Sequence, residues 1–109
     1  MYRKQAAQGI AMAIKFYTEK GYPVFIPVSD VSRYDLIIDT PLGLKRVEVK
    51  TTSAKDIPLR TSGGNASWNG EVKRISSQEC DIVFCYNIKT LAFKEFDAKD
   101  LEGRATIRI

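Results

Sequence analysis

Two carboxylates and one lysine stand close together in the first half of the chain. Glu48 and Lys50 are two residues apart, with Val49 between them, in a segment that alternates apolar and charged side chains. Because successive side chains of a strand point to opposite faces, we expect Glu48 and Lys50 to leave the same face. Asp35 opens the preceding apolar segment, and a hairpin turning at residues 41–43 would bring it level with them. The spacing therefore predicts that the three side chains converge.

These residue types suit the hydrolysis of a phosphodiester with Mg²⁺. The chain has no histidine and only two cysteines, which excludes imidazole mechanisms and a zinc site of ordinary ligand spacing. Magnesium takes one or two carboxylates and keeps water and phosphate oxygens as its other ligands. Asp35 and Glu48 suit that role, with Mn²⁺ expected to substitute, and Lys50 could hold the attacking water or stabilise the developing charge. The alternative is a solvent-facing ion pair of little energetic value.

The positive charge is concentrated in the middle of the chain. The net charge is +4, and residues 45–74 alone carry seven basic and three acidic side chains. An anionic polymer would favour such a segment, because each Lys or Arg that meets a phosphate releases counterions. DNA is the predicted partner, although an ordinary solvated surface has the same composition. The candidate DNA-binding residues are Arg33, Thr51, Lys55, Arg60, Trp68, Lys73 and Arg74.

Two of these candidates have an equally plausible structural role. Thr51 follows the lysine of the motif and could donate to a phosphate, or it could be a β-branched residue that fills the end of a strand. Trp68 stands in the Gly-, Ser- and Asn-rich stretch 61–70. It could stack on an unpaired base, or it could anchor its loop to the core.

The surrounding elements predict an α/β fold with one domain over residues 1–109, in which an N-terminal helix packs on one face of a mixed sheet. Apolar residues recur at helical spacing over residues 3–20, and Gly21 and Pro23 end that pattern. Alternating or continuous apolar runs predict the strands, and shorter helical turns are expected at 74–80 and 98–101. The predicted strands cover residues 22–28, 34–39, 44–51, 81–88, 91–96 and 105–109, the fourth of these being internal to the sheet.

The compartment is expected to be cytoplasmic and reducing. The longest apolar runs are five residues, far short of the roughly 20 that cross a bilayer, and the N-terminus shows no secretory cleavage pattern. Cys80 and Cys85 are five residues apart in what reads as a strand, so we expect reduced core thiols that point to opposite faces.

With these residues in place, the chain resembles the PD-(D/E)XK nuclease superfamily. The resemblance is carried by Asp35, twelve intervening residues and Glu48-Val49-Lys50, on a hairpin preceded by a helix and a strand. It covers roughly residues 3–88, and the chain is most similar to archaeal Holliday junction resolvases and to homing endonucleases built on the same fold. The resemblance implies a restriction-endonuclease-like fold, metal binding by Asp35 and Glu48, a third ligand from the Val49 carbonyl, and assistance to the nucleophile by Lys50.

The first helix departs from the family pattern. Many relatives carry a glutamate there that reaches the metal, whereas this helix offers only Gln5 and Gln8. Gln8 is the better candidate, because it lies two turns into the helix and could orient a metal-bound water as an amide. We therefore expect one principal metal per site. Tyr34 also replaces the proline of the motif, which affects backbone shape rather than ligation.

These features predict a Mg²⁺-dependent DNA endonuclease, either of the homing or restriction kind or of the junction-resolving kind. Symmetric cutting needs two active sites, so a homodimer or a higher homo-oligomer is expected. A catalytically inactive nucleic-acid-binding module on the same fold remains an alternative, for which the missing helix carboxylate is the best argument.

Overall fold

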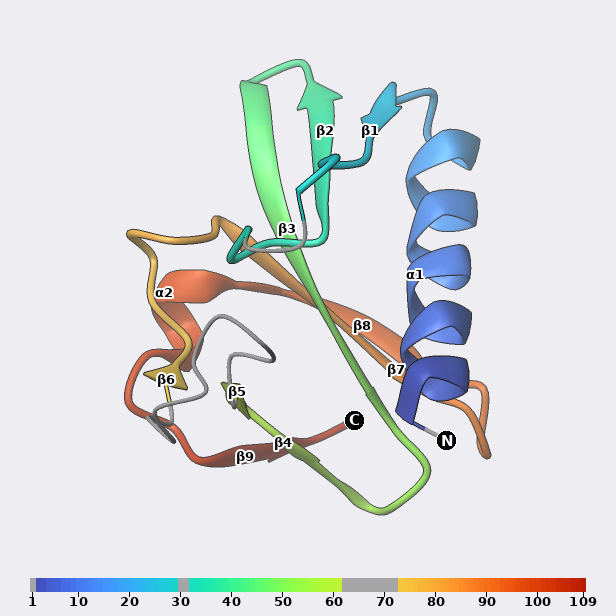
Figure 1. Ribbon diagram of the computed structural model, residues 1–109, viewed down its shortest axis with the longest axis vertical. Helices are drawn as coiled ribbons and strands as arrows, with labels where there is room; N and C mark the ends of the chain where they lie inside the picture. Colours follow the sequence, from blue (N-terminus) through green and yellow to red (C-terminus); the bar gives the residue numbers. More distant parts are fainter. Residues whose placement is uncertain (1, 30–31, 62–72) are drawn as a thin grey trace.

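The computed structural model describes residues 2–29, 32–61 and 73–109. A five-stranded mixed sheet in the order β1-β2-β3-β7-β8 forms its centre, with β3 and β7 parallel and the other neighbours antiparallel (Figure 1). Two small sheets, β4-β9 and β5-β6, lie beside it. In chain order the elements are α1 (Tyr2–Glu19), β1 (Val24–Phe25), β2 (Leu36–Thr40), β3 (Gly43–Thr52), β4 (Asp56–Pro58), β5 (Arg60–Thr61), β6 (Lys73–Arg74), β7 (Ile82–Asn87), β8 (Phe93–Asp97), α2 (Ala98–Leu101) and β9 (Thr106–Arg108).

The β2-β3 hairpin sets the level of the candidate residues. Its turn is closed by the Thr40 hydroxyl, which accepts from the Leu42 amide and donates to the Gly43 carbonyl, and Gly43 adopts a positive φ of 110°. Leu36 pairs with Val47, and β2 begins there, directly after Asp35. The predicted hairpin and its register are confirmed.

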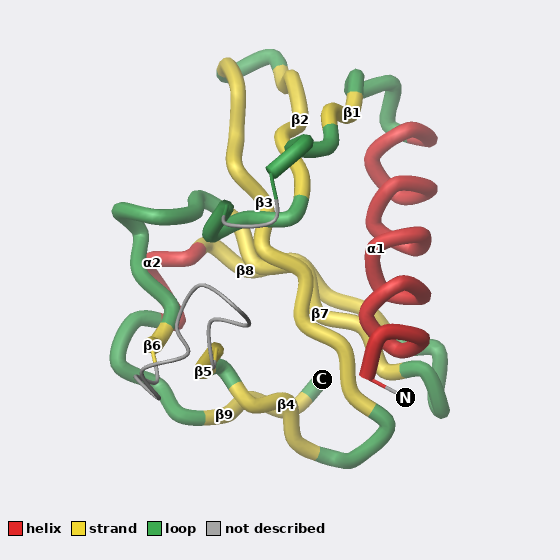
Figure 2. The backbone as a smooth tube through the Cα atoms, in the orientation of Figure 1, coloured by secondary structure: helices red, strands yellow, loops and turns green. Residues whose placement is uncertain are grey.

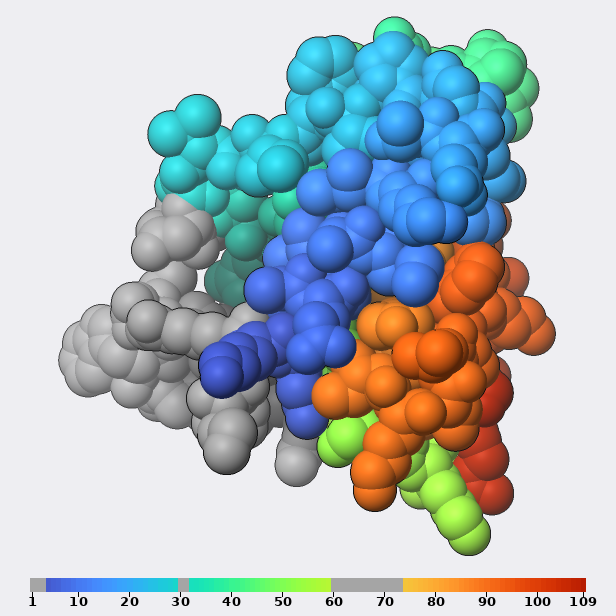
Figure 3. All heavy atoms as spheres, turned by 90° about the vertical axis from the view of Figure 1, so that its right-hand side faces the viewer, coloured from blue at the N-terminus to red at the C-terminus, as the bar shows by residue number. Residues whose placement is uncertain are grey.

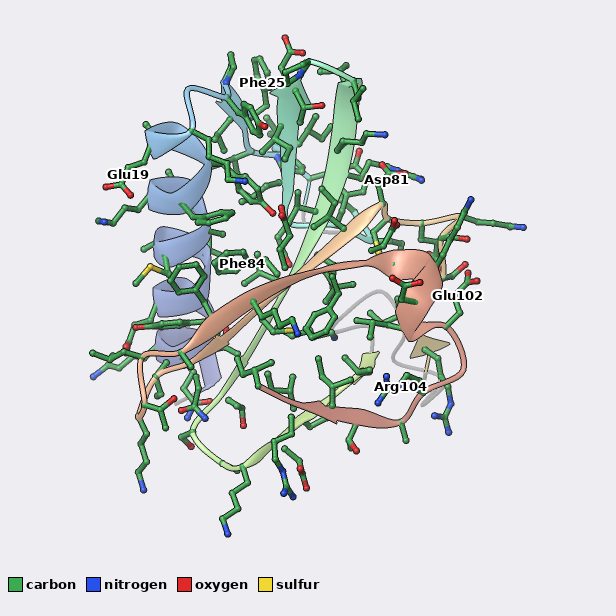
Figure 4. All side chains as sticks on the ribbon, turned by 180° about the vertical axis from the view of Figure 1, so that it is seen from behind. Glu19, Phe25, Asp81, Phe84, Glu102 and Arg104 are labelled. Atoms are coloured by element: carbon green, nitrogen blue, oxygen red, sulfur yellow. The ribbon has the colours of Figure 1, made fainter. Side chains whose placement is uncertain are left out.

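Helix α1 covers one face of the sheet (Figure 2). Its buried residues meet inward-facing residues of β2, β3 and β7 in a cluster that we call the helix-side core: Ala13, Tyr17, Leu36, Ile38, Val47, Phe84 and Tyr86. Phe84 lies between the sheet and the helix (Figure 4). Close approach is possible because Gly9 has no Cβ, and an added Cβ would lie only 2.1 Å from the Thr51 hydroxyl. The predicted N-terminal helix on one face is confirmed.

The opposite face of the sheet is covered by α2 and by the β4-β9 pair. Their apolar side chains meet β7 in a second cluster, the far-side core: Ile57, Leu59, Ile75, Cys80, Val83, Cys85, Ala98, Leu101 and Ile107. Both cysteines are free and buried, as expected. The prediction that they point to opposite faces is wrong, because Cys80 lies before β7 rather than in it and both thiols join the same cluster.

Most predicted elements are confirmed to within two residues at each end, and β7 is internal as expected. Two predictions are wrong. Of residues 22–28 only Val24 and Phe25 form a strand, between two prolines that limit backbone pairing. Residues 74–80 form a strand end and a turn instead of a helix. Arg46 holds this turn, because its guanidinium donates to the carbonyls of Ser77 and Gln78 and to the Asp81 carboxylate. No described helix is long and apolar enough to cross a membrane.

Candidate active site

Asp35, Glu48 and Lys50 converge where β2 begins beside β3. The Lys50 ammonium lies 3.3 Å from the Glu48 carboxylate, and each of these side chains is only 13% exposed. The Asp35 carboxylate accepts a 2.7 Å hydrogen bond from the Val49 amide, and it also makes hydrogen-bond contact with the Glu48 carboxyl. The trio is therefore a largely buried cluster joined to the backbone, rather than a solvent-facing ion pair.

The cluster lies on the face of the sheet opposite to α1. Side chains alternate along β3, so Val47 faces the helix-side core while Glu48 and Lys50 project the other way. The parallel register sets Glu48 beside Val83 and Lys50 beside Cys85, two members of the far-side core. The charged groups thus rest on an apolar floor, which withdraws them from water.

Burial changes the protonation of both carboxyls. The pKa of Glu48 is raised to about 7, first by burial and then by the neighbouring Asp35 carboxylate, while Lys50 opposes the shift. Burial also raises the pKa of Asp35, against the effect of the hydrogen bond from the Val49 amide. Two carboxyl groups that are costly to ionise side by side form a set of oxygen donors that a divalent cation would satisfy.

The Val49 backbone faces the same edge. Its amide donates to Asp35, and the amide and carbonyl of one strand residue point to the same side of the strand. The Val49 carbonyl therefore points past the first residue of β2, toward the side of β3 on which Asp35 stands. Its position fits the third-ligand role that the resemblance implies. Asp35 and Glu48, with this carbonyl, are the groups that would hold a cation.

A small cleft beside Glu48 contains two of the predicted DNA-binding residues. Arg33 and Arg74 line it together with Glu48 and Glu79. Arg33 forms an ion pair with Glu79, with 3.2 Å between the arginine Nε and the carboxylate, and both side chains are about one-third exposed. Glu79 was not among the predicted site residues. It lies outside any recognisable motif, and only the turn before β7 brings it to the site.

Other predicted residues lie elsewhere. Gln8 is exposed on α1, which packs on the face of β3 opposite to Glu48 and Lys50, so the structure does not bring it to the trio. Gln5 donates to the Ser53 hydroxyl at 3.4 Å. The Thr51 hydroxyl is buried beneath Gly9 of α1 and forms no hydrogen bond with any described residue.

The DNA-contact prediction for Thr51 therefore does not fit this structure, and its role as a strand-end packing residue does. Lys55 is exposed in the turn after β3, beyond the trio. The side chains of Arg60 and Lys73, and all of Trp68, lie outside the described residues.

Comparisons with known proteins identify the family and the fold of this chain. The family model of the PD-(D/E)XK endonucleases matches residues 2–109. A solved structure of a bacterial homing endonuclease, I-Ssp6803I, is similar in fold, with a TM-score of 0.81 and 19% sequence identity over 98% of this chain and 76% of that one. No match was found among curated proteins. The expected restriction-endonuclease-like fold is thus confirmed, and the chain belongs to the PD-(D/E)XK endonuclease family.

Proposed function

We propose that this protein is a Mg²⁺-dependent DNA endonuclease, with residues 1–109 forming one nuclease domain. The observation that carries the proposal is the contact between the Asp35 and Glu48 carboxyls, with the Lys50 ammonium 3.3 Å from Glu48. Asp35, Glu48 and the Val49 carbonyl would hold the cation. When bound, such a cation supplies positive charge to the scissile phosphate and lowers the pKa of water.

The residues of the chain have separable roles in this proposal. Lys50 can hold a water molecule or stabilise negative charge on the phosphate, because its ammonium is fixed by Glu48 on the same face of β3. The apolar floor under β3 limits access of bulk water and strengthens these electrostatic interactions. Arg33 and Arg74 share the cleft with Glu48, which supports a role for them as contacts to phosphates next to the reacting one, although Arg33 would first have to leave its ion pair with Glu79.

Duplex cleavage of the homing or restriction kind is the favoured activity, since the similar solved structure is that of a homing endonuclease. We propose a homodimer or a higher homo-oligomer, because cutting both strands symmetrically requires two active sites. Junction resolution is the second candidate, and it is supported by the compact size of the domain and the spacing of its motif. Light scattering of the purified protein tests the oligomeric state.

The test of the activity uses supercoiled plasmid and a four-way junction, each with Mg²⁺ or with EDTA. Wild type should cut at least one substrate with Mg²⁺ only, and Glu48→Ala should reduce the rate by about a hundredfold or more. Glu19→Gln is the matched control, because Glu19 forms an exposed ion pair with Lys15 on the surface of α1. Preferential cutting of the junction would identify a resolvase. No cutting of either substrate by wild type would refute the nuclease proposal.

The inactive-module alternative makes a different prediction. In that case Asp35→Ala should leave DNA binding unchanged or improved, and no divalent cation should promote cutting by wild type. If the protein is an endonuclease, Asp35→Ala should abolish cleavage in the presence of Mg²⁺, while DNA binding in EDTA should persist. Binding and cleavage measured on the same DNA therefore separate the two functions.

A further inference from the structure

Two turns lie side by side at one end of the central sheet. Because β3 and β7 are parallel and in register, the turn that follows β3 (residues 53–55) and the turn that follows β7 (residues 88–92) emerge at the same end. Figure 3 shows the segments around these turns and the C-terminal strand gathered at the lower end of the molecule, next to the first turns of α1. This end also contains the C-terminal half of the strand that carries Glu48 and Lys50.

The buried amide of Asn87 ties the two turns together. Its Nδ2 donates to the Ala54 carbonyl at 2.9 Å, while its Oδ1 accepts from the amides of Lys89 and Thr90 at 2.9 and 3.2 Å. Asn87 is only 5% exposed, so these three bonds are formed away from water and hold both turns in a fixed relation. The β3 backbone joins the same arrangement, because the Ile88 amide donates to the Thr52 carbonyl.

The cleft between the turns is positively charged. Lys55, Lys89 and Arg108 line it, and no described acidic side chain does. Arg108 is paired with Asp56, with 3.0 Å between Nε and Oδ1, so Lys55 and Lys89 are the exposed basic side chains of this lining that form no ion pair with another described residue. The Lys89 and Thr90 amides are already used by Asn87. The cleft therefore offers the positive charge of flexible lysine side chains rather than fixed backbone N–H donors. Such charge suits the repeating phosphates of a nucleic-acid backbone better than it suits one small anion.

We propose that this cleft binds backbone phosphates of the DNA that enters the active site, with Lys55 and Lys89 as the contacts and Asn87 as the residue that positions them. The inference rests on the proposed endonuclease function. Lys55 is five residues after Lys50, so their Cα atoms lie at most about 17 Å apart. Phosphates of one strand advance about 3.4 Å per base pair along the helix axis, which places the contacts within roughly five base pairs of the cut.

The test measures binding of a fluorescent mixed-sequence duplex in EDTA as a function of salt. Removing two phosphate contacts in Lys55→Ala/Lys89→Ala should reduce the slope of log affinity against log salt by about 1.8 and weaken binding about tenfold or more near 0.1 M salt. Lys15→Ala/Lys20→Ala removes two exposed lysines near the other end of α1 and is the matched control. Its slope should stay within about 0.3 of the wild-type value.

Asn87→Ala tests the positioning role. It should weaken binding in the wild-type background but have little further effect in Lys55→Ala/Lys89→Ala, which a general loss of stability would not reproduce. Equal losses in the lysine variant and its control would refute the cleft proposal, as would an unchanged slope, even if wild type cuts DNA with Mg²⁺. Failure of wild type to bind or cut any DNA would refute the proposed function, and the cleft proposal with it.

Discussion

Replacing Glu48 by glutamine should stabilise the metal-free protein at alkaline pH. The pKa of Glu48 is raised from 4.5 to about 7, chiefly by burial and then by Asp35. The folded state therefore keeps a proton that the unfolded state has released. The contribution of Glu48 to the free energy of unfolding is fully present below its unfolded pKa of 4.5. It falls as the pH rises toward the folded pKa of about 7, and it is lost above that value.

The size of the effect follows from this interval. Each tenfold change in proton affinity corresponds to about 1.4 kcal/mol, so ionising Glu48 in the folded protein costs about 3 kcal/mol at pH 8 and above. Glutamine removes that cost and keeps the shape of the side chain. Glu48→Gln should therefore be more stable than wild type by up to about 3 kcal/mol at pH 8, or roughly 10 °C in Tm, and nearly equal to it at pH 5.

Urea unfolding and Tm, both measured in EDTA at intervals from pH 5 to pH 9, provide the assay. Glu19→Gln is the control, because its exposed i,i+4 pair with Lys15 is worth about 0.3–0.5 kcal/mol. Addition of Mg²⁺ at pH 8 should raise the Tm of wild type and leave that of Glu48→Gln nearly unchanged, since the cation needs the carboxylate. A difference between variant and wild type that does not vary with pH would refute the reasoning, as would a less stable variant at pH 8.

Three further changes test how the site is supported. Gly9→Ala should lower the free energy of unfolding by about 1–3 kcal/mol in urea titrations, because the new Cβ would lie 2.1 Å from the Thr51 hydroxyl. This loss should outweigh the higher helix propensity of alanine. Adding Thr51→Ala should restore most of the lost stability, and a double variant that is no more stable than Gly9→Ala would contradict the packing explanation. Thr51→Val should stabilise by about 1 kcal/mol in the same titrations, because it removes a buried hydroxyl that has no hydrogen-bond partner in the described part of the chain. A loss of stability would show that the hydroxyl is satisfied. Leu91 has a φ of 66° and is 64% exposed, so Leu91→Gly should raise the Tm through relief of about 1 kcal/mol of strain, and a lower Tm would show that the leucine packs against its neighbours.

Much of the fold was predictable because its determinants are local. The helix ends near Gly21, which has a φ of 85°, and the β2-β3 turn is closed by Thr40 and Gly43 within four residues. The turn formed by residues 74–80 and the shortness of β1 were not predictable in this way. The turn before β7 depends on Arg46, 31 to 35 residues earlier in the chain, whose bonds replace those that a helix would have formed.

The sequence by itself determined that Glu48 and Lys50 share a face and that Asp35 stands level with them. Strand alternation and a tight hairpin fix these relations within about fifteen residues, so no distant contact is needed. Only the tertiary structure decided what surrounds the trio. Helix α1 packs against the opposite face, which separates Gln8 from the site and buries Thr51, and the parallel pairing of β3 with β7 brings Asn87 and Lys89 beside Lys55. Such contacts join segments more than thirty residues apart, and their partners are selected by packing of the whole core rather than by any local pattern.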